Sequence, residues 1–179
     1  DHAVGDIMAG LDRRAKREQT LVLFFSDNGA IPDQRNETWL TSPDPRDRYT
    51  PGTAGGDNRP LRGKKTTVYE GGIRVPAFVH WRGRIALGQF HGVMHVADWM
   101  PTLLGVTGST PRADLRWDGA DMWPALAGRQ PAPARELYWV SARWSDSAVR
   151  DGDWKLIVTH AGDRAQLFDL QQDPGEAAD

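Results

Sequence analysis

The sequence predicts an α/β fold with a mostly parallel sheet and helices, followed by a small antiparallel sheet near the C-terminus. Two patterns in the 179 residues support this prediction. Near the N-terminus, a helical pattern leads into the continuous apolar run Leu21–Ser26, which is typical of a strand covered on both faces in a parallel sheet. After residue 135, short strand-like runs follow one another with turn residues between them, as in an antiparallel ribbon.

The first expected element is an amphipathic helix over roughly residues 2–18. Charged residues fill one side of it, and apolar residues recur at helical spacing on the other: Val4, Ile7, Met8, Leu11 and Ala15. In a complete α/β sheet, further strands and helices would cover this face and the run Leu21–Ser26. We therefore expect the chain to expose a large apolar surface and to associate with itself or with sequence outside it.

The stretch Ala30–Arg59 shows neither strand nor helix periodicity and contains Pro32, Pro43, Pro45 and Pro51. A structureless stretch of this length inside a compact domain is usually a functional or a disordered loop. We expect a mobile loop that helps to select substrates. Trp39, within this stretch, is the candidate for stacking on a substrate.

The elements after this loop are shorter. Apolar residues cluster in a second expected strand near Arg74–Trp81. Asp98 is the expected N-cap of a helix that ends at Gly105 or Gly108. A short helix is expected near Met122–Ala127. Four strands complete the chain, with Asp151-Gly152 as a two-residue hairpin turn: Glu136–Ser141, Ser147–Arg150, Trp154–Thr159 and Gln166–Leu170.

Composition excludes several classes of protein. The formal net charge of -2 argues against a general polyanion binder, and no apolar run approaches the length of a membrane span. Because Cys is absent, this chain holds no disulfide, thiolate metal site or cysteine nucleophile. The sequence starts at Asp1 inside a helical pattern, without an initiator Met, so we expect further sequence to precede it.

Asp27-Asn28 follows the expected buried strand, where ligands bind in open α/β sheets. A carboxylate and an amide oxygen suit Ca²⁺ or Mg²⁺. The alternative is a simple turn, because Asn-Gly strongly favours one. A metal would need more ligands, since Ca²⁺ takes about 6–8 oxygens.

The segment Arg62-Gly63-Lys64-Lys65 brings three cations together. Such a group can hold an oxyanion, with Arg as a bidentate fork and Lys as a point charge. The alternative is a solvated basic patch. Nucleic-acid binding is weaker still, because interleaved aromatic residues are few.

Taken in chain order, several segments resemble the second half of the type I sulfatases. The stretch around Gly55–Gly72 and the segment His95–Trp99 are most similar to the arylsulfatase B (N-acetylgalactosamine-4-sulfatase) branch. The matching segments are Phe24–Gly29, Asn58–Lys65, Tyr69–Pro76, Ala97–Leu104, Asp118-Gly119, Gly152–Leu156, Phe168–Leu170 and Asp173–Glu176.

The resemblance implies an alkaline-phosphatase-like sulfatase fold. Residues 1–130 would be the C-terminal half of its α/β domain, and residues 131–179 a small, truncated antiparallel subdomain. It further implies that Asp27 and Asn28 are metal ligands, for Ca²⁺ or Mg²⁺, and that Lys65 is the catalytic lysine that binds the sulfate and the leaving-group side. The substrate would be a sulfate ester, including sulfated sugars, with no nucleic acid or membrane partner. By family tendency the protein would be periplasmic, secreted or lysosomal.

Several parts of the family pattern are missing from this chain: the nucleophile motif, the N-terminal aspartates that complete the metal site, and the Lys and His residues that surround the sulfate. The nucleophile of the family is a formylglycine made within a C/S-x-P-x-R motif, and this sequence has no such motif. We therefore expect a C-terminal portion of a sulfatase that is inactive by itself. Two alternatives stay open: a non-catalytic remnant or assembly partner, and a phosphoryl or phosphonate ester hydrolase of the same superfamily.

Overall fold

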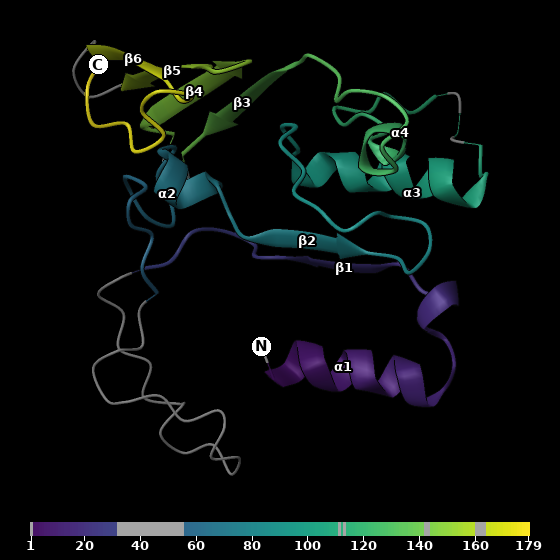
Figure 1. The fold of residues 1–179 in the computed structure, drawn as a ribbon. Helices are drawn as coiled ribbons and strands as arrows, with labels where there is room; N and C mark the ends of the chain where they lie inside the picture. The colour runs from purple at the N-terminus through teal and green to yellow at the C-terminus, as the bar shows by residue number, and fades with distance from the viewer. Residues whose placement is uncertain (1, 32–55, 111, 113, 142–143, 160–163) are drawn as a thin grey trace. The chain divides into compact units, whose positions relative to one another are not determined.

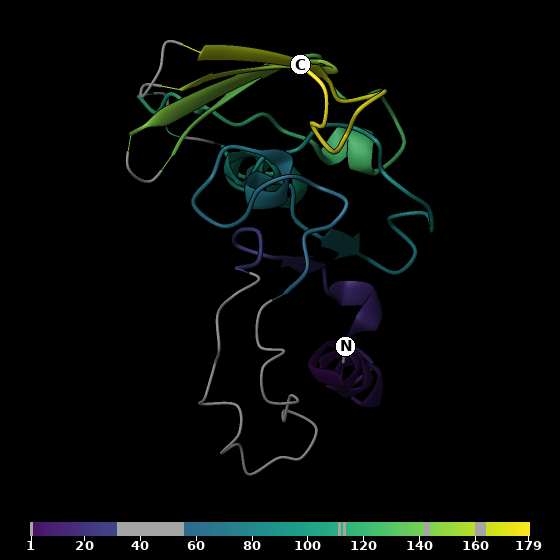
Figure 2. The same cartoon turned by 90° about the vertical axis from the view of Figure 1, so that its left-hand side faces the viewer.

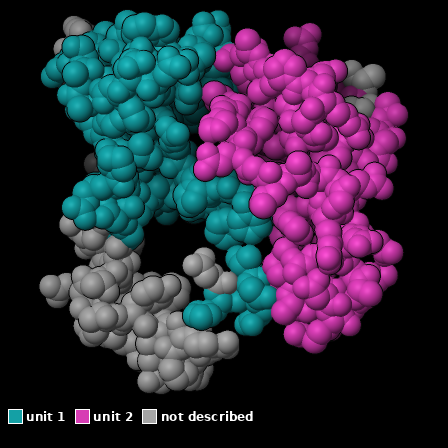
Figure 3. All heavy atoms as spheres, viewed as in Figure 1, with its two compact units in different colours: residues 1–7, 23–78, 136–179 teal, residues 8–22, 79–135 magenta. Residues whose placement is uncertain are grey.

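The computed structural model describes residues 2–31, 56–110, 112, 114–141, 144–159 and 164–179 (Figure 1). Most of the expected mobile loop, with Trp39, lies outside the described residues. The chain divides into two compact units (Figure 3). Unit 1 comprises residues 1–7, 23–78 and 136–179, and unit 2 comprises residues 8–22 and 79–135. The expected boundary between residues 130 and 131 stays a prediction.

Helix α1 (His2–Arg13) is shorter than the sequence predicts. It ends because Ala15 adopts a left-handed conformation, with a φ of 51°. The amide of Lys16 then donates to the carbonyl of Leu11 and that of Ala15 to Asp12, which is the Schellman pattern of helix termination. A short 3-10 helix, η1 (Arg17–Gln19), follows. None of the residues of α1, all of which the structure describes, is buried.

Strands β1 (Val22–Phe25) and β2 (Ala77–His80) form a two-stranded sheet. Phe24 stacks on Phe78 with ring centroids 5.2 Å apart, whereas the amide of Ser26 donates to the carbonyl of Pro76. From the first contact to the second, the position advances by two residues along β1 (24 to 26) and goes back by two near β2 (78 to 76). The strands therefore run antiparallel (Figure 1). The parallel pairing predicted for this run is not found among the described strands, because an apolar run does not define the direction of its partner.

Short helices make up much of the remaining chain. Helix α2 (Glu70–Ile73) precedes β2, and a 3-10 helix, η4 (Val96–Asp98), leads into α3 (Trp99–Thr107). Helix α3 ends at Gly108, which is left-handed with a φ of 67°, as expected for one of the two predicted glycines. Helix α4 (Trp123–Leu126) lies where the short helix was predicted.

Asp98 precedes α3 as predicted but does not act as its cap. Its Oδ2 accepts the amide of His95 and its Oδ1 accepts the amide of Ala120 and the guanidinium of Arg135. Asp98 is fully buried, so within the described part of the chain it anchors the loops of unit 2 rather than the first turn of α3.

The four C-terminal strands are confirmed, within a residue or two of their predicted ends. They are β3 (Glu136–Val140), β4 (Asp146–Asp151), β5 (Trp154–Thr159) and β6 (Arg164–Asp169), paired antiparallel in chain order. They form one layer (Figure 2). One face carries the core of unit 1, in which Ala148, Ile157 and Phe168 pack with Val68 and Leu170.

The other face of this sheet is apolar and exposed. The register aligns Tyr138 with Val149, Val149 with Leu156, and Leu156 with Leu167. Tyr138 is 71% exposed and Leu167 51%. A row of apolar side chains therefore crosses this face. The expectation drawn from the sequence concerned other segments, α1 and the run Leu21–Ser26, where Ile7 is 59% and Phe24 41% exposed. Self-association stays a prediction. Over the residues that the structure describes, no helix has both the length and the apolar character needed to cross a membrane.

Candidate functional site

The turn Asp27–Gly29, directly after β1, packs against α2. The amide of Gly29 donates to the carbonyl of Gly72 over 2.9 Å, and Ser26 Oγ donates to the carbonyl of Asn28. A Cβ at Gly29 would lie 1.8 Å from the carbonyl oxygen of Gly71, so only glycine permits this approach of two backbones. The carboxylate of Asp27 is exposed and Asn28 is half-buried.

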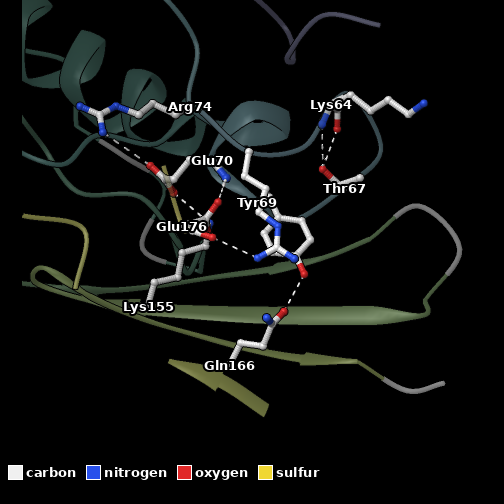
Figure 4. A network of polar contacts seen from close by, with 9 residues as sticks. Lys64, Thr67, Tyr69, Glu70, Arg74, Lys155, Gln166 and Glu176 are labelled. Atoms are coloured by element: carbon white, nitrogen blue, oxygen red, sulfur yellow. Dashed lines mark hydrogen bonds and ion pairs between the residues drawn. The ribbon is translucent and has the colours of Figure 1, made fainter. Parts of the chain in front are cut away.

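The loop that carries Lys65 lies beside this turn. The amide of Lys65 donates to the carbonyl of Ala30 over 3.2 Å, which joins Lys65 to the residue that follows the turn. Thr67 closes the loop, since its Oγ1 donates to the carbonyl of Lys64 and accepts the amide of the same residue (Figure 4). The side chain of Lys65 is exposed. Two segments more than 30 positions apart in the sequence are thus joined through their backbones.

Asn58 strengthens this junction. Its Oδ1 accepts the amide of Ala30 at 2.8 Å, while its Nδ2 donates to the carbonyls of Ala30 and Gly63. The side-chain amide of Asn58 thus forms one hydrogen bond with the backbone amide and one with the carbonyl of Ala30, as the backbone of a neighbouring strand would. Sequence analysis did not single out Asn58 as a site residue. Its only signal was its place at the start of the Asn58–Lys65 segment.

Arg62 does not belong to the oxyanion group that the sequence suggests. Its guanidinium lies 4.2 Å from the ring centroid of Tyr69, and its Nη1 donates to the carbonyl of Glu176 over 3.0 Å. The guanidinium therefore holds two parts of unit 1 together. The cations that remain for an anion in this loop are Lys64 and Lys65, both of them exposed.

A buried ionic cluster, formed by Lys155, Glu70 and Glu176, lies beneath α2 (Figure 4). Lys155 Nζ donates to Glu70 Oε1 at 2.9 Å and to Glu176 Oε1 at 2.7 Å, and each of the three residues is at most 2% exposed. Burial raises the pKa of the Glu176 carboxyl above its ordinary value, against the opposing effect of Lys155. The sequence pattern did not predict this cluster.

The metal assignment rests on Asp27 and Asn28 alone. Within the described ranges, no group of three or more His, Cys, Asp or Glu residues is placed to hold a metal ion. The donor set nevertheless fits a hard cation, because both side chains offer oxygen and Asp27 is accessible. Further ligands would have to come from outside the described residues.

Solved structures with a similar fold define the class of protein. A sulfatase, PsFucS1 from Pseudoalteromonas sp., matches with a TM-score of 0.72 and 28% identity, over 97% of this chain and 35% of that chain. A phosphonate monoester hydrolase from Silicibacter pomeroyi matches with a TM-score of 0.61 and 22% identity, over 94% of this chain and 32% of that chain, which shows a shared fold only. The chain has the alkaline-phosphatase-like α/β fold of the sulfatases.

The sequence comparisons then give the family. The family model described as Sulfatase matches residues 1–109, and the chain belongs to the sulfatase family. Human arylsulfatase A is 31% identical over 201 aligned residues, which cover 98% of this chain and 36% of that protein. N-acetylgalactosamine-6-sulfatase of Canis lupus familiaris is 35% identical over 131 residues, covering 73% of this chain and 22% of that protein. The chain thus spans about a third or less of these relatives.

The family resemblance inferred from the sequence is therefore confirmed. The assignment to the arylsulfatase B branch stays a prediction, because the relatives include arylsulfatase A, N-acetylgalactosamine-6-sulfatase and a steryl-sulfatase.

Proposed function

We propose that this chain contributes part of the active site of a sulfuric ester hydrolase. The observation that carries the proposal is the backbone junction between the turn at Asp27–Gly29 and the loop at Lys65, made by the Lys65 amide and the Ala30 carbonyl. Residues that match the family's metal ligands and its lysine thereby come from adjoining segments of one compact unit.

In this proposal Asp27 and Asn28 would hold a Ca²⁺ or Mg²⁺ ion through their side-chain oxygens, together with ligands from outside this chain. When bound, such a cation supplies charge stabilisation at a nonbridging sulfate oxygen. Lys65 would bind the sulfate and the leaving-group oxygen with its ammonium. Cleavage of a sulfate ester builds negative charge on these oxygens, so a cation there favours the transition state over the ground state.

The nucleophile would lie in sequence outside this chain. Here there is no Cys and no C/S-x-P-x-R motif, and we propose a formylglycine elsewhere in the whole protein. The chain alone would then be inactive. A non-catalytic assembly partner is the alternative reading of the same observation. The substrate class we propose is a sulfate ester of a sugar, since relatives carry names such as N-acetylgalactosamine-6-sulfatase. A location outside the cytoplasm, by family tendency, belongs to the same proposal.

Phosphonate ester hydrolysis is the second candidate. It is favoured by the shared fold with a phosphonate monoester hydrolase. A lysine and a divalent cation would stabilise a phosphonate as well as a sulfate, so the two candidate functions differ in which anion the loop at Lys65 prefers.

Ligand titration of the purified chain tests the proposal. Backbone amide signals of residues 27–30 should shift when Ca²⁺ alone is added, and the signals of residues 63–67 should shift with inorganic sulfate more than with methylphosphonate. Asp27→Ala should abolish the first response. Asp114→Ala, which removes an exposed carboxylate of unit 2 that is paired with Arg112, should preserve it.

Turnover is the second readout. The chain should not cleave 4-nitrophenyl sulfate. Cleavage that disappears in Lys65→Ala but persists in Lys64→Ala would show that the chain holds its own nucleophile, and the inactive-portion reading would be wrong. A larger response to methylphosphonate than to sulfate would favour the second candidate function.

A further inference from the structure

We propose that Lys155, on β5 of the C-terminal sheet, is a positioning residue for the candidate site, which it controls through α2. This inference rests on the proposed function where it calls Asp27, Asn28 and Lys65 a site. The claim that Lys155 holds α2, and α2 the two segments, does not depend on that function. Lys155 is the centre of the buried ionic cluster, and the cluster holds the first residue of a helix whose backbone contacts both segments of the site.

The first step is the attachment of Lys155 to α2. Glu70 is the first residue of α2. Its carboxylate accepts a hydrogen bond from Lys155 Nζ, and its backbone amide donates one to Glu176 Oε2 over 2.7 Å. Arg74 Nη1 lies 3.8 Å from the second oxygen of Glu70, at the exposed rim. The position of α2 is thus defined by charged groups from three parts of the sequence.

The charge balance explains why the cluster is rigid. Two carboxylates and one ammonium are almost fully removed from water, and the Lys155 ammonium also lies 6.0 Å from the ring centroid of Trp139. Buried charges are tolerated only when they are paired and hydrogen-bonded. Removing Lys155 would leave two neighbouring carboxylates without their shared cation, so α2 would lose its anchor.

The second step leads from α2 to the site. The amide of Gly71 donates to the carbonyl of Arg62 over 2.6 Å, and the carbonyl of Gly72 accepts the amide of Gly29. A Cβ at Gly71 would lie 2.5 Å from the Arg62 carbonyl, and one at Gly72 would lie 2.3 Å from that of Thr67. Helix α2 is therefore packed, backbone to backbone, between the turn at Asp27 and the loop that carries Lys65.

A smaller contact supports the same connection. Tyr69, which precedes α2, donates its hydroxyl to Gln166 Oε1 on β6 over 2.6 Å (Figure 4). The C-terminal sheet thus holds both the start of α2 and the residue before it. A shift of α2 against this sheet would move the turn at Asp27 and the loop at Lys65 together.

Native-state hydrogen exchange followed by NMR tests this inference on the folded chain. The reporters are the hydrogen-bonded amides of Gly29, Lys65 and Gly71. Lys155→Met removes the ammonium and keeps most of the side-chain volume. We expect exchange of the three reporters to accelerate at least tenfold, while the amides of α3 in unit 2 stay within twofold of the wild type.

Arg135→Met is the matched control. It removes another largely buried cation, the partner of Asp98 in unit 2. It should accelerate exchange in unit 2 and leave the three reporters unchanged. Unchanged reporters in Lys155→Met, or equal acceleration throughout the chain, would overturn the inference. If Lys155→Met does not fold, Glu176→Gln replaces it, with at least threefold acceleration of the same reporters expected and unchanged reporters overturning the inference.

A titration with Ca²⁺ alone separates this inference from the proposed function. We expect Lys155→Met to weaken Ca²⁺ binding at least fivefold and Arg135→Met to leave it unchanged. Selective exchange without Ca²⁺ binding in the wild type would support the positioning role and show that Asp27 and Asn28 do not hold the ion without further ligands. Ca²⁺ binding without selective exchange would support the metal assignment and overturn the positioning role.

Discussion

The two sheets of this chain differ in which of their residues are buried. In the two-stranded sheet, Phe24 and Phe25 of β1 are 41% and 39% exposed, although this strand is entirely apolar. In the four-stranded sheet, β5 buries the ammonium of Lys155 completely, next to Ile157. The more apolar strand is therefore the less buried of the two.

The difference shows that burial depends on how many elements cover a strand. β5 lies inside its sheet, between β4 and β6, and one of its faces meets the core of unit 1. β1 pairs with β2 in a sheet of two strands. A two-stranded sheet is only marginally stable without cover from other elements. Lys155 tolerates burial because two carboxylates accept hydrogen bonds from its ammonium.

The largest effect on stability should come from truncating one apolar side chain in each sheet and comparing the two losses. Ile157→Ala, at a fully buried position, should lower the free energy of unfolding by about 3 kcal/mol through lost burial and a cavity. Phe24→Ala removes a larger side chain, yet we expect a loss of less than about 1.5 kcal/mol because the ring is partly exposed. Urea unfolding followed by circular dichroism measures both. Equal losses would contradict the contrast between the sheets.

Charge on the exposed face of the four-stranded sheet should change self-association. The row of apolar side chains through Tyr138 and Leu167 predicts association at micromolar concentration. Leu167→Lys should shift the association midpoint to at least several-fold higher concentration in light scattering. Gln171→Lys, the same charge added at an exposed polar position, should have no effect. A wild-type chain that is a clean monomer would contradict this prediction and the expectation drawn from the sequence.

The buried ionic cluster should make the free energy of unfolding depend on pH, and we expect this effect to be smaller than the two preceding ones. Because burial raises the pKa of Glu176 in the folded chain, its contribution to stability is complete below the pKa of the unfolded carboxyl. This contribution is lost as the pH rises through the folded pKa. Between pH 4 and 8, the wild type should therefore lose more stability than Glu176→Gln. The difference between the two unfolding profiles isolates Glu176 from the other carboxyls, and identical profiles would count against a raised pKa.

The C-terminal strands could be predicted from the sequence almost completely, and the start of the chain only in part. The predicted turn Asp151-Gly152 places the hairpin between β4 and β5 one residue too early, because Asp151 still pairs with Trp154 and the loop residues are Gly152 and Asp153. Alternation of side chains sets one face of these strands toward the core. In α1 the apolar spacing continues to Ala15, but a left-handed residue ends the helix earlier. A hydrophobic period carries no information about that backbone conformation.

In the candidate site, too, some residues could be predicted from the sequence and others could not. Asp27, Asn28 and Lys65 could be named from short segments, because such segments specify residue types and their order. Asn58 could not, since its role is to bind the backbone of Ala30, 28 positions away. Side-chain pairing with a distant backbone leaves no local pattern.

The sequence by itself determines the family and the positions of most helices and strands, because motif order, local spacing and turn residues act over a few positions. The roles of Asp27, Asn28 and Lys65 follow from the resemblance and stay predictions. Only the tertiary structure decides that β1 pairs antiparallel, that Arg62 turns to Tyr69, and that Lys155 is buried. The partners of Lys155 lie 85 and 21 positions away, at Glu70 and Glu176. The same lysine would be a solvated surface charge without them, so its role follows from long-range contacts that a sequence pattern does not contain.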